Sequence, residues 1–206
     1  MSSTRQKFLI LTAVLGLQAG NVVMPLRAAP LPEAQRTPVD VRRVTLVVRD
    51  IEQSLPLYRD ALGLKVVYDE KIGGGTDKDG KTTPPSVRLV LLRANDDFVG
   101  LIGLMQRLNP PQAPPPPVFQ KAQAGGHIIV INVADLDTRF ARVRATPGVK
   151  IADEPEPIEY PAPGGKGTIP VLFSAVWDPD GNFIELNKIL GTPAGKTANG
   201  AAPRRP

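Results

Sequence analysis

Three ionisable side chains stand out as candidates for chemistry, namely His127, Glu185 and Arg43. The chain of 206 residues contains one histidine and no cysteine. This composition excludes disulfides, thiolate metal sites, a cysteine nucleophile and any site built from two histidines of one chain. Glu185 interrupts the apolar run of a predicted strand, so its carboxylate faces either solvent or a cavity. Arg43 is permanently cationic and could hold a carboxylate or phosphate through a bidentate pair.

Strand alternation sorts these candidates by face, because successive side chains of a strand point to opposite sides. Glu185 shares a face with Phe183 and Asn187, and His127 shares one with the other odd-numbered residues of its predicted strand. Structural alternatives remain open for each candidate. His127 could be a hydrogen-bonded residue at a strand start, Glu185 an ion-pair partner of Arg43 or a solvent-facing residue, and Arg43 an exposed cation at a sheet edge.

The positive charge of the chain lies at its two ends. The formal net charge is +5, with 25 Lys and Arg against 20 Asp and Glu. Three of these cations precede residue 30 and three follow residue 190, so the stretch between carries 19 cations against all 20 acids. That stretch shows no basic stripe with interleaved aromatic residues. The sequence therefore excludes nucleic acid as a partner.

Residues 1–28 have the features of a secretory signal peptide: Arg5 and Lys7, then the apolar run Phe8–Leu17, then small residues. The run is shorter than the roughly 20 apolar residues of a spanning helix. We therefore expect a periplasmic or secreted protein without a stable membrane span after cleavage, with a retained N-terminal anchor as the alternative. The basic tail at residues 191–206, rich in Gly, Ala and Pro, is expected to be disordered.

The rest of the chain predicts two units with the same order of elements. The segment 107–125 separates them, and six prolines in its first eleven residues predict an extended linker. Each flank, 40–106 and 126–190, begins with an alternating strand and continues into a helix capped by Asp50 or Asp135. Three more strands complete each unit, so the order is βαβββ, twice. The expected strands are 43–49, 64–70, 86–93 and 98–105, then 127–133, 150–153, 169–177 and 182–188, with 154–168 as a connection rich in Gly and Pro.

Three stretches carry a resemblance to a known family: RVTLVVRDIEQSLPLYRDALGLKVVYDE (43–70), GGHIIVINVADLDTRFARV (125–143) and AVWDPDGNFIELNKI (175–189). In this order they resemble the vicinal oxygen chelate (VOC) superfamily, which includes glyoxalase I, bleomycin-resistance proteins and extradiol dioxygenases. The resemblance covers about residues 41–190. It implies an α+β fold in which two βαβββ modules form a curled mixed sheet, a cup around a ligand.

The resemblance also implies where a metal would be held. In metal-dependent members four strand positions, usually His, Glu, His and Glu, point into the cup. They map to Arg43, Gly103, His127 and Glu185, with Gln106 as a poorer match than Gly103. Only His127 and Glu185 could then ligate a metal, and two protein ligands are fewer than a catalytic site normally takes. The expected cofactor is therefore none, or a divalent metal among which Zn, Ni, Fe and Mn are not distinguished. An extradiol dioxygenase, which needs two histidines, is excluded for a single chain.

The sequence favours an exported protein whose cup lacks a full metal site and binds or sequesters a small ligand, which could be anionic. Arg43, Phe183 and Trp177 are the predicted ligand-binding residues. The alternative is a metal-dependent glyoxalase-like lyase or isomerase for a small carbonyl substrate, with Glu185 as a metal ligand and catalytic base. Whether the modules pair within one chain or between the chains of a homodimer is left open.

Overall fold

The computed structural model describes residues 32–110, 115–162, 164 and 167–191. The predicted signal peptide at 1–28 and all of the predicted tail except Gly191 lie outside these residues. None of the helices within the described ranges has both the length and the hydropathy that crossing a bilayer requires.

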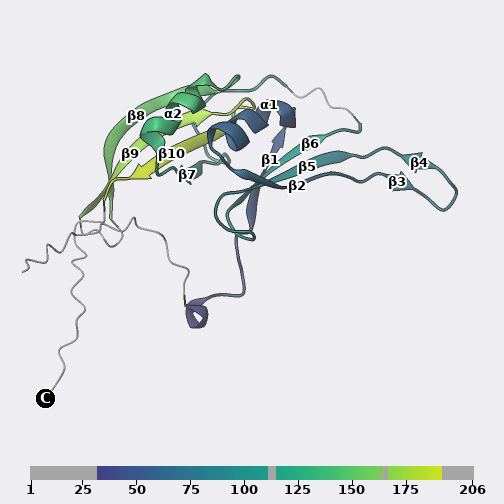
Figure 1. Cartoon of the computed structure of the whole chain (residues 1–206), viewed down its shortest axis with the longest axis horizontal. Coiled ribbons are helices and arrows are strands. Elements are labelled where there is room, and N and C mark those ends of the chain that lie inside the picture. The colour runs from purple at the N-terminus through teal and green to yellow at the C-terminus, as the bar shows by residue number, and fades with distance from the viewer. Residues whose placement is uncertain (1–31, 111–114, 163, 165–166, 192–206) are drawn as a thin grey trace, which may run out of the picture.

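The first module has the predicted order of elements and builds a four-stranded sheet in the order β1-β6-β5-β2, in which β1 runs parallel to β6. A hairpin of two short strands between β2 and β5 projects away from the body of the protein (Figure 1). The elements are a short 3-10 helix (Glu33–Gln35), β1 (Arg43–Val48), α1 (Ile51–Leu55), a π-helical turn η2 (Pro56–Ala61), β2 (Lys65–Ile72), β3 (Gly75–Thr76), β4 (Thr82–Thr83), β5 (Val87–Arg93) and β6 (Leu101–Arg107).

The second module repeats this plan in a sheet with the order β7-β10-β9-β8, in which β7 runs parallel to β10. Its elements are β7 (Ile129–Asn132), α2 (Leu136–Ala145), β8 (Lys150–Pro161), β9 (Thr168–Trp177) and β10 (Phe183–Ile189). The predicted α+β fold with two βαβββ modules is therefore confirmed.

One strand is much longer than its sequence suggests. Residues 154–161, predicted as part of a connection, continue β8 and pair with β9 as far as the partners Pro161 and Thr168. Because β8 is the edge strand of its sheet, Pro155 and Pro157 can lie in it without breaking a ladder on both sides. The pairing of β8 with β9 shifts register twice, between Ile151 and Glu156, which accommodates this irregular stretch.

The two helix starts differ. The Asp50 carboxylate accepts a hydrogen bond of 2.9 Å from the Glu52 backbone N–H, so the predicted cap is confirmed. Asp135 is the N-cap residue of α2, as predicted, but the expected capping hydrogen bond of its side chain is not formed. Its carboxylate binds the Arg139 guanidinium through two contacts of 2.8 Å and makes no capping bond. Arg139 one turn along the helix therefore competes successfully for the carboxylate.

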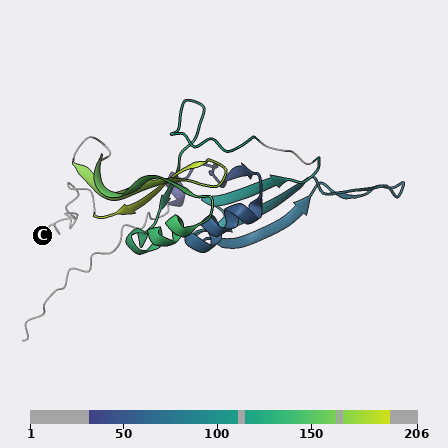
Figure 2. The same ribbon diagram turned by 90° about the horizontal axis from the view of Figure 1, so that it is seen from above.

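Both helices lie on the same side of the two sheets and share one apolar core (Figures 1 and 2). That core joins both modules, since it includes fully buried side chains of each helix and of each sheet. Among them are Ile51, Leu57, Val90, Leu104, Leu136, Val143, Val176, Ile184 and Leu186. The opposite face of the sheets, which we call the cup face, carries no helix.

The turn between β9 and β10 fixes one module against the other through a buried carboxylate. The Tyr58 hydroxyl, from η2 of the first module, donates a 2.8 Å hydrogen bond to Asp178 Oδ2. Asp178 also accepts the backbone N–H groups of Asp180 and Asn182 and the Asn182 side-chain amide. Burial raises the pKa of Asp178 although these donors oppose the shift, and burial, then the Asp178 charge, raise the pKa of Tyr58. Tyr58 therefore remains a donor at neutral pH.

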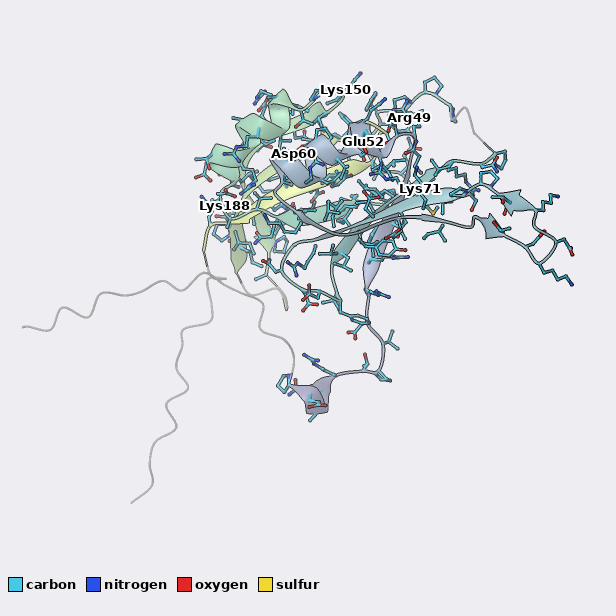
Figure 3. The ribbon with its side chains drawn as sticks, turned by 45° about the vertical axis from the view of Figure 1, so that its right-hand side comes forward. Arg49, Glu52, Asp60, Lys71, Lys150 and Lys188 are labelled. Atoms are coloured by element: carbon cyan, nitrogen blue, oxygen red, sulfur yellow. The ribbon has the colours of Figure 1, made fainter. Side chains whose placement is uncertain are left out.

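A second contact joins the same turn to the end of β1. The backbone N–H and the Nε–H of Arg49 donate to Asp180 Oδ1 at 3.1 and 2.7 Å, and its guanidinium also donates to the Pro179 carbonyl. Ser54 from α1 donates to the other Asp180 oxygen at 3.4 Å. Figure 3 shows Arg49 close to the start of α1, where Glu52 is labelled. Together Arg49, Tyr58, Asp178 and Asp180 form what we call the inter-module clamp.

Removing the Tyr58 hydroxyl leaves a buried carboxylate with one donor fewer. We expect Tyr58→Phe to lower the free energy of unfolding by about 1–3 kcal/mol in a urea titration. Tyr68→Phe is the matched control, because Tyr68 is exposed on β2 and its loss should change stability by no more than about 0.5 kcal/mol. Equal stabilities of the two variants would show that the hydrogen bond from Tyr58 to Asp178 contributes nothing.

Candidate functional site

Glu185 lies on the cup face, as strand alternation predicted. Its neighbours Ile184 and Leu186 are fully buried in the core under the helices. Across the sheet Glu185 is level with Ala175 on β9 and with Val130 on β7. Since side chains level with one another share a face, the cup face of the second sheet is defined by these three positions.

Glu185 has two polar neighbours on the cup face, Asn187 on its own strand and Tyr160 on β8. Asn187 is 8% exposed and its side chain lies near enough to Tyr160 to lower the pKa of that residue, while its Oδ1 has no partner among the described residues. Burial and then the Glu185 charge raise the pKa of Tyr160, and Asn187 opposes this shift. We call Glu185, Asn187 and Tyr160 the polar cluster. It combines one carboxylate with one unused acceptor, so it is suited to partners that donate hydrogen bonds.

Arg43 lies at a cavity between the two sheets. β1 and β7 are facing edge strands, and the cavity of about 430 Å³ between them, the seam cavity, has walls of aliphatic side chains such as Val44 and Ile128. Its polar lining residues include Arg43, which is exposed, Asn95 and Asn132. Across the described ranges no carboxylate forms an ion pair with Arg43.

The predicted ion pair between Arg43 and Glu185 is therefore not formed. Glu185 is on β10, and β7 lies between that strand and the edge that holds Arg43. Arg43 is an exposed residue in the lining of the seam cavity, and it has no ion-pair partner among the described residues.

His127 lies at a second cavity, next to the start of β7. Residues 115–127 connect the modules, and we call them the strap. A cavity of about 260 Å³ lies between the strap and the start of β10, and His127, Asn182 and Phe183 line it. His127 precedes β7, which begins at Ile129, and its side chain is exposed.

The strap also covers Trp177, which was predicted to bind ligand together with Phe183. The rings of Trp177 and Phe183 lie 5.7 Å apart, and Phe119 of the strap also packs against Trp177 at 6.3 Å. The Trp177 indole N–H donates a 3.0 Å hydrogen bond to the Gln120 carbonyl. The structure thus brings Trp177 and Phe183 together on the cup face, but against the chain's own strap.

The structure does not bring the two predicted metal ligands together. Ile129 and Val133, which alternate with the same parity as His127, belong to the core on the helix side, whereas Glu185 is level with Val130. The odd-numbered residues that follow His127 in its strand therefore face the helices, on the opposite side of the sheet from Glu185. Gly103 supplies no donor, and a Cβ there would approach Thr45 Oγ1 to 2.8 Å.

These donors do not fit a catalytic metal centre with three protein ligands. No group of three or more His, Cys, Asp or Glu side chains that could hold a metal occurs within the residues that the structure describes. The chain therefore offers charge through Arg43 and hydrogen bonding through the polar cluster, and no chemical step is derived through a metal.

Two of the site residues escaped the sequence analysis for different reasons. Alternation grouped Asn187 with Glu185, but an amide in a strand carries no signal of burial by itself. Tyr160 was assigned to a connection because Pro155 and Pro157 obscured the strand that contains it. A strand prediction that tolerated proline at a sheet edge would have placed Tyr160 on β8.

Comparisons with known proteins agree with this fold. A sequence model of the Glyoxalase/Bleomycin resistance protein/Dioxygenase superfamily matches residues 41–186. A 2-epi-5-epi-valiolone epimerase from an Actinomyces species is 28% identical over 162 residues, which are 76% of this chain and 81% of that protein. A glyoxalase family protein from Bacillus cereus superposes with a TM-score of 0.53 at 15% identity, covering 78% of this chain and 100% of that chain. For the trypanothione-dependent glyoxalase I of Leishmania major the TM-score is 0.47 at 22% identity, over 73% and 86% of the two chains.

The polar cluster predicts how Tyr160 titrates. A nearby carboxylate opposes formation of a tyrosinate, so Glu185→Gln should lower the pKa of Tyr160. The titration is followed by tyrosinate absorbance in the near ultraviolet, and the curve of Tyr160→Phe is subtracted to isolate this residue from the other two tyrosines. Glu159→Gln, on the adjacent residue, serves as the charge control. An unchanged Tyr160 curve in Glu185→Gln would mean that the carboxylate does not face this hydroxyl.

Proposed function

Because the chain belongs to the glyoxalase/bleomycin resistance protein/dioxygenase superfamily, we propose that it binds or sequesters a small organic anion in the seam cavity without a full metal site. One observation carries the proposal: Arg43 lines an otherwise mainly apolar cavity, and no carboxylate in the part of the chain that the structure describes forms an ion pair with it. A guanidinium in such surroundings is suited to a single carboxylate or phosphate, which it can contact through two parallel hydrogen bonds.

The size and lining of the seam cavity support a ligand with an apolar body. Its volume of about 430 Å³ falls within the range of small-molecule sites, roughly 300–1,000 Å³. Aliphatic side chains from β1 and β7 form two of its walls, and the amides of Asn95 and Asn132 add hydrogen-bonding groups. The expected ligand therefore has one anionic group at Arg43 and an aliphatic or alicyclic remainder.

The polar cluster disfavours a second anionic group on the ligand. Asn132 is level with Asn187, so the lining of the cavity continues along β7 toward the polar cluster on β10. Because Glu185 and the free Asn187 oxygen are both acceptors, a second anionic group would be repelled there. Hydroxyl or amine groups would be favoured at that end of the ligand.

The alternative is a metal-dependent lyase or isomerase of the glyoxalase type. It is supported by family membership and by the name of the epimerase relative. In this mechanism His127 and Glu185 would both ligate the metal, although Glu185 lies on the cup face of β10 and His127 lies before the start of β7. Glu185 would also have to serve as the base. Direct anion binding needs no such rearrangement, so we favour it.

Carboxylate binding is tested with hexanoate and its neutral counterpart hexanol by isothermal titration calorimetry. We expect hexanoate to bind and hexanol to bind more weakly. Arg43→Gln should weaken hexanoate binding by about 10- to 100-fold, because a charge-assisted pair is lost. Arg107→Gln, an exposed cation at the end of β6 in the same sheet, should leave it unchanged. Equal hexanoate affinity in wild type and Arg43→Gln would overturn the proposal.

A metal titration of the apoprotein with Zn²⁺, Ni²⁺, Fe²⁺ and Mn²⁺ discriminates the alternative. Tight one-to-one binding that is lost in both His127→Ala and Glu185→Ala would favour the lyase or isomerase. Weak binding that is the same in wild type and both variants would support the metal-free proposal.

The proposal includes export, which is supported by the leader-like residues 1–28 alone. We expect the mature protein, expressed from the full chain in a Gram-negative bacterium, to fractionate with the periplasm. Its N-terminus, determined by mass spectrometry, should lie after the apolar run Phe8–Leu17. A full-length protein recovered with the membrane would instead indicate a retained anchor.

A further inference from the structure

We propose that Phe119 of the strap plugs a subsite for an aromatic ring on the cup face of the second sheet, and that external ring ligands bind there when the strap moves aside. This inference goes beyond the proposed anion site and does not depend on Arg43. Its basis is the position of the Phe119 ring, which takes the place that a ligand ring would take.

The subsite has three components around the Phe119 ring. Trp177 meets it edge to face, with ring centroids 6.3 Å apart and an angle of 75° between the planes. The Lys150 ammonium lies 4.2 Å from the centroid of the same ring, within cation–π distance. Phe183 also packs against Trp177, with the ring centroids 5.7 Å apart. A phenyl ring is thus held by a T-shaped contact with an aromatic ring and by a cation over its face, both of which are favourable for an aromatic ring.

The subsite opens to the cup face. Val176 and Ile184 are buried in the core under the helices, so their neighbours Trp177 and Phe183 face the other way. Lys150 is level with Trp177 on the adjacent strand and shares that face. Figure 2 shows the chain between the modules passing over the side of the second sheet that is opposite the helices. Phe119 therefore occupies the face on which a cup ligand would bind.

Few contacts hold the strap in place. The bond from Trp177 to the Gln120 carbonyl and the 3.5 Å ion pair of Lys121 with Asp153 are its polar contacts to the second sheet that the structure shows among the described residues. The Lys121 side chain is 71% exposed, and an exposed pair of this kind contributes little. The backbone of Val118 in the strap lies close against Gly181, but elsewhere a cavity of about 260 Å³ lies between the strap and the start of β10, so the packing under the strap is incomplete. Segments with so few buried contacts open at low free-energy cost.

The ring contacts define the ligand class. Because a cation faces the ring, an electron-rich aromatic ring should bind better than a saturated ring of the same size. We therefore choose para-cresol as the probe and methylcyclohexanol as its saturated counterpart. Neither carries a charge at neutral pH, so the test does not involve the guanidinium of Arg43.

The chain has one tryptophan, so the indole N–H of Trp177 gives one resonance that reports this subsite directly. In Phe119→Ala we expect para-cresol to shift this resonance at a concentration about tenfold lower than in wild type, because no internal ring competes. Methylcyclohexanol should shift it less. Phe98→Ala is the control, since Phe98 is an exposed ring of the first module that lies under Arg42; it should behave as wild type.

A second variant and a second measurement keep the result interpretable. Phe119→Leu retains an apolar plug without a π face, so its para-cresol affinity should lie between those of wild type and Phe119→Ala. Acrylamide quenching of Trp177 fluorescence should increase in Phe119→Ala while circular dichroism stays unchanged. Equal para-cresol affinity in wild type and Phe119→Ala, or equal response to the saturated probe, would overturn the proposal. The hexanoate experiment with Arg43→Gln tests the anion site, and the para-cresol experiment with Phe119→Ala tests the aromatic subsite. Either proposal can therefore be overturned without affecting the other.

Discussion

The arrangement of the whole molecule depends on the Asp178 carboxylate, which is buried between the modules. Taking a carboxylate out of water is costly unless donors replace its hydration. Here Tyr58 of the first module and Asn182 and the backbone of the β9–β10 turn supply those donors. The position of the turn relative to η2 is therefore specified closely. Since β10 starts directly after this turn, its register, and with it the position of Glu185 on the cup face, is set by the same contact.

The two modules have the same order of elements, so the end of the first strand of each module could contact the turn before the last strand of the other. The clamp is formed at the end of β1, whereas the residues at the end of β7 differ. Arg49, at the end of β1, binds the turn of the second module. The equivalent residue at the end of β7 is Ala134, which precedes Asp135 as Arg49 precedes Asp50. The equivalent loop between β5 and β6 contributes Ala94 and Asn95 to the seam cavity. At the end of β7 there is no equivalent of Arg49, and the β5–β6 loop is not a tight turn like the one between β9 and β10. The seam cavity lies on this side of the molecule, where no clamp joins the modules.

Local patterns predicted the fold well because they reflect local physics. Alternation along β10 reported the two faces of the sheet, and Asp50 marked a helix start through its cap. The same patterns failed where a distant partner or a sheet edge decides the outcome. Asp135 found Arg139, and the prolines of β8 are tolerated at an edge. For the site, Glu185 could be placed, but the pairing of Trp177 with Phe119 joins positions 58 residues apart along the chain, and no spacing rule predicts such contacts.

Arg43 stands at a position where the resemblance implies a metal-binding His, and an arginine there favours a different kind of chemistry in the cup. A metal held at the four positions that the resemblance implies would be a positive charge between donors of both sheets. At those positions Gly103 offers no donor, Arg43 is a cation, and His127 precedes the first residue of its strand. In the proposed function the positive charge comes from the Arg43 guanidinium at the edge of one sheet, next to the seam. An anion bound there would lie between the modules, and Glu185 would act as an acceptor for the uncharged end of the same molecule.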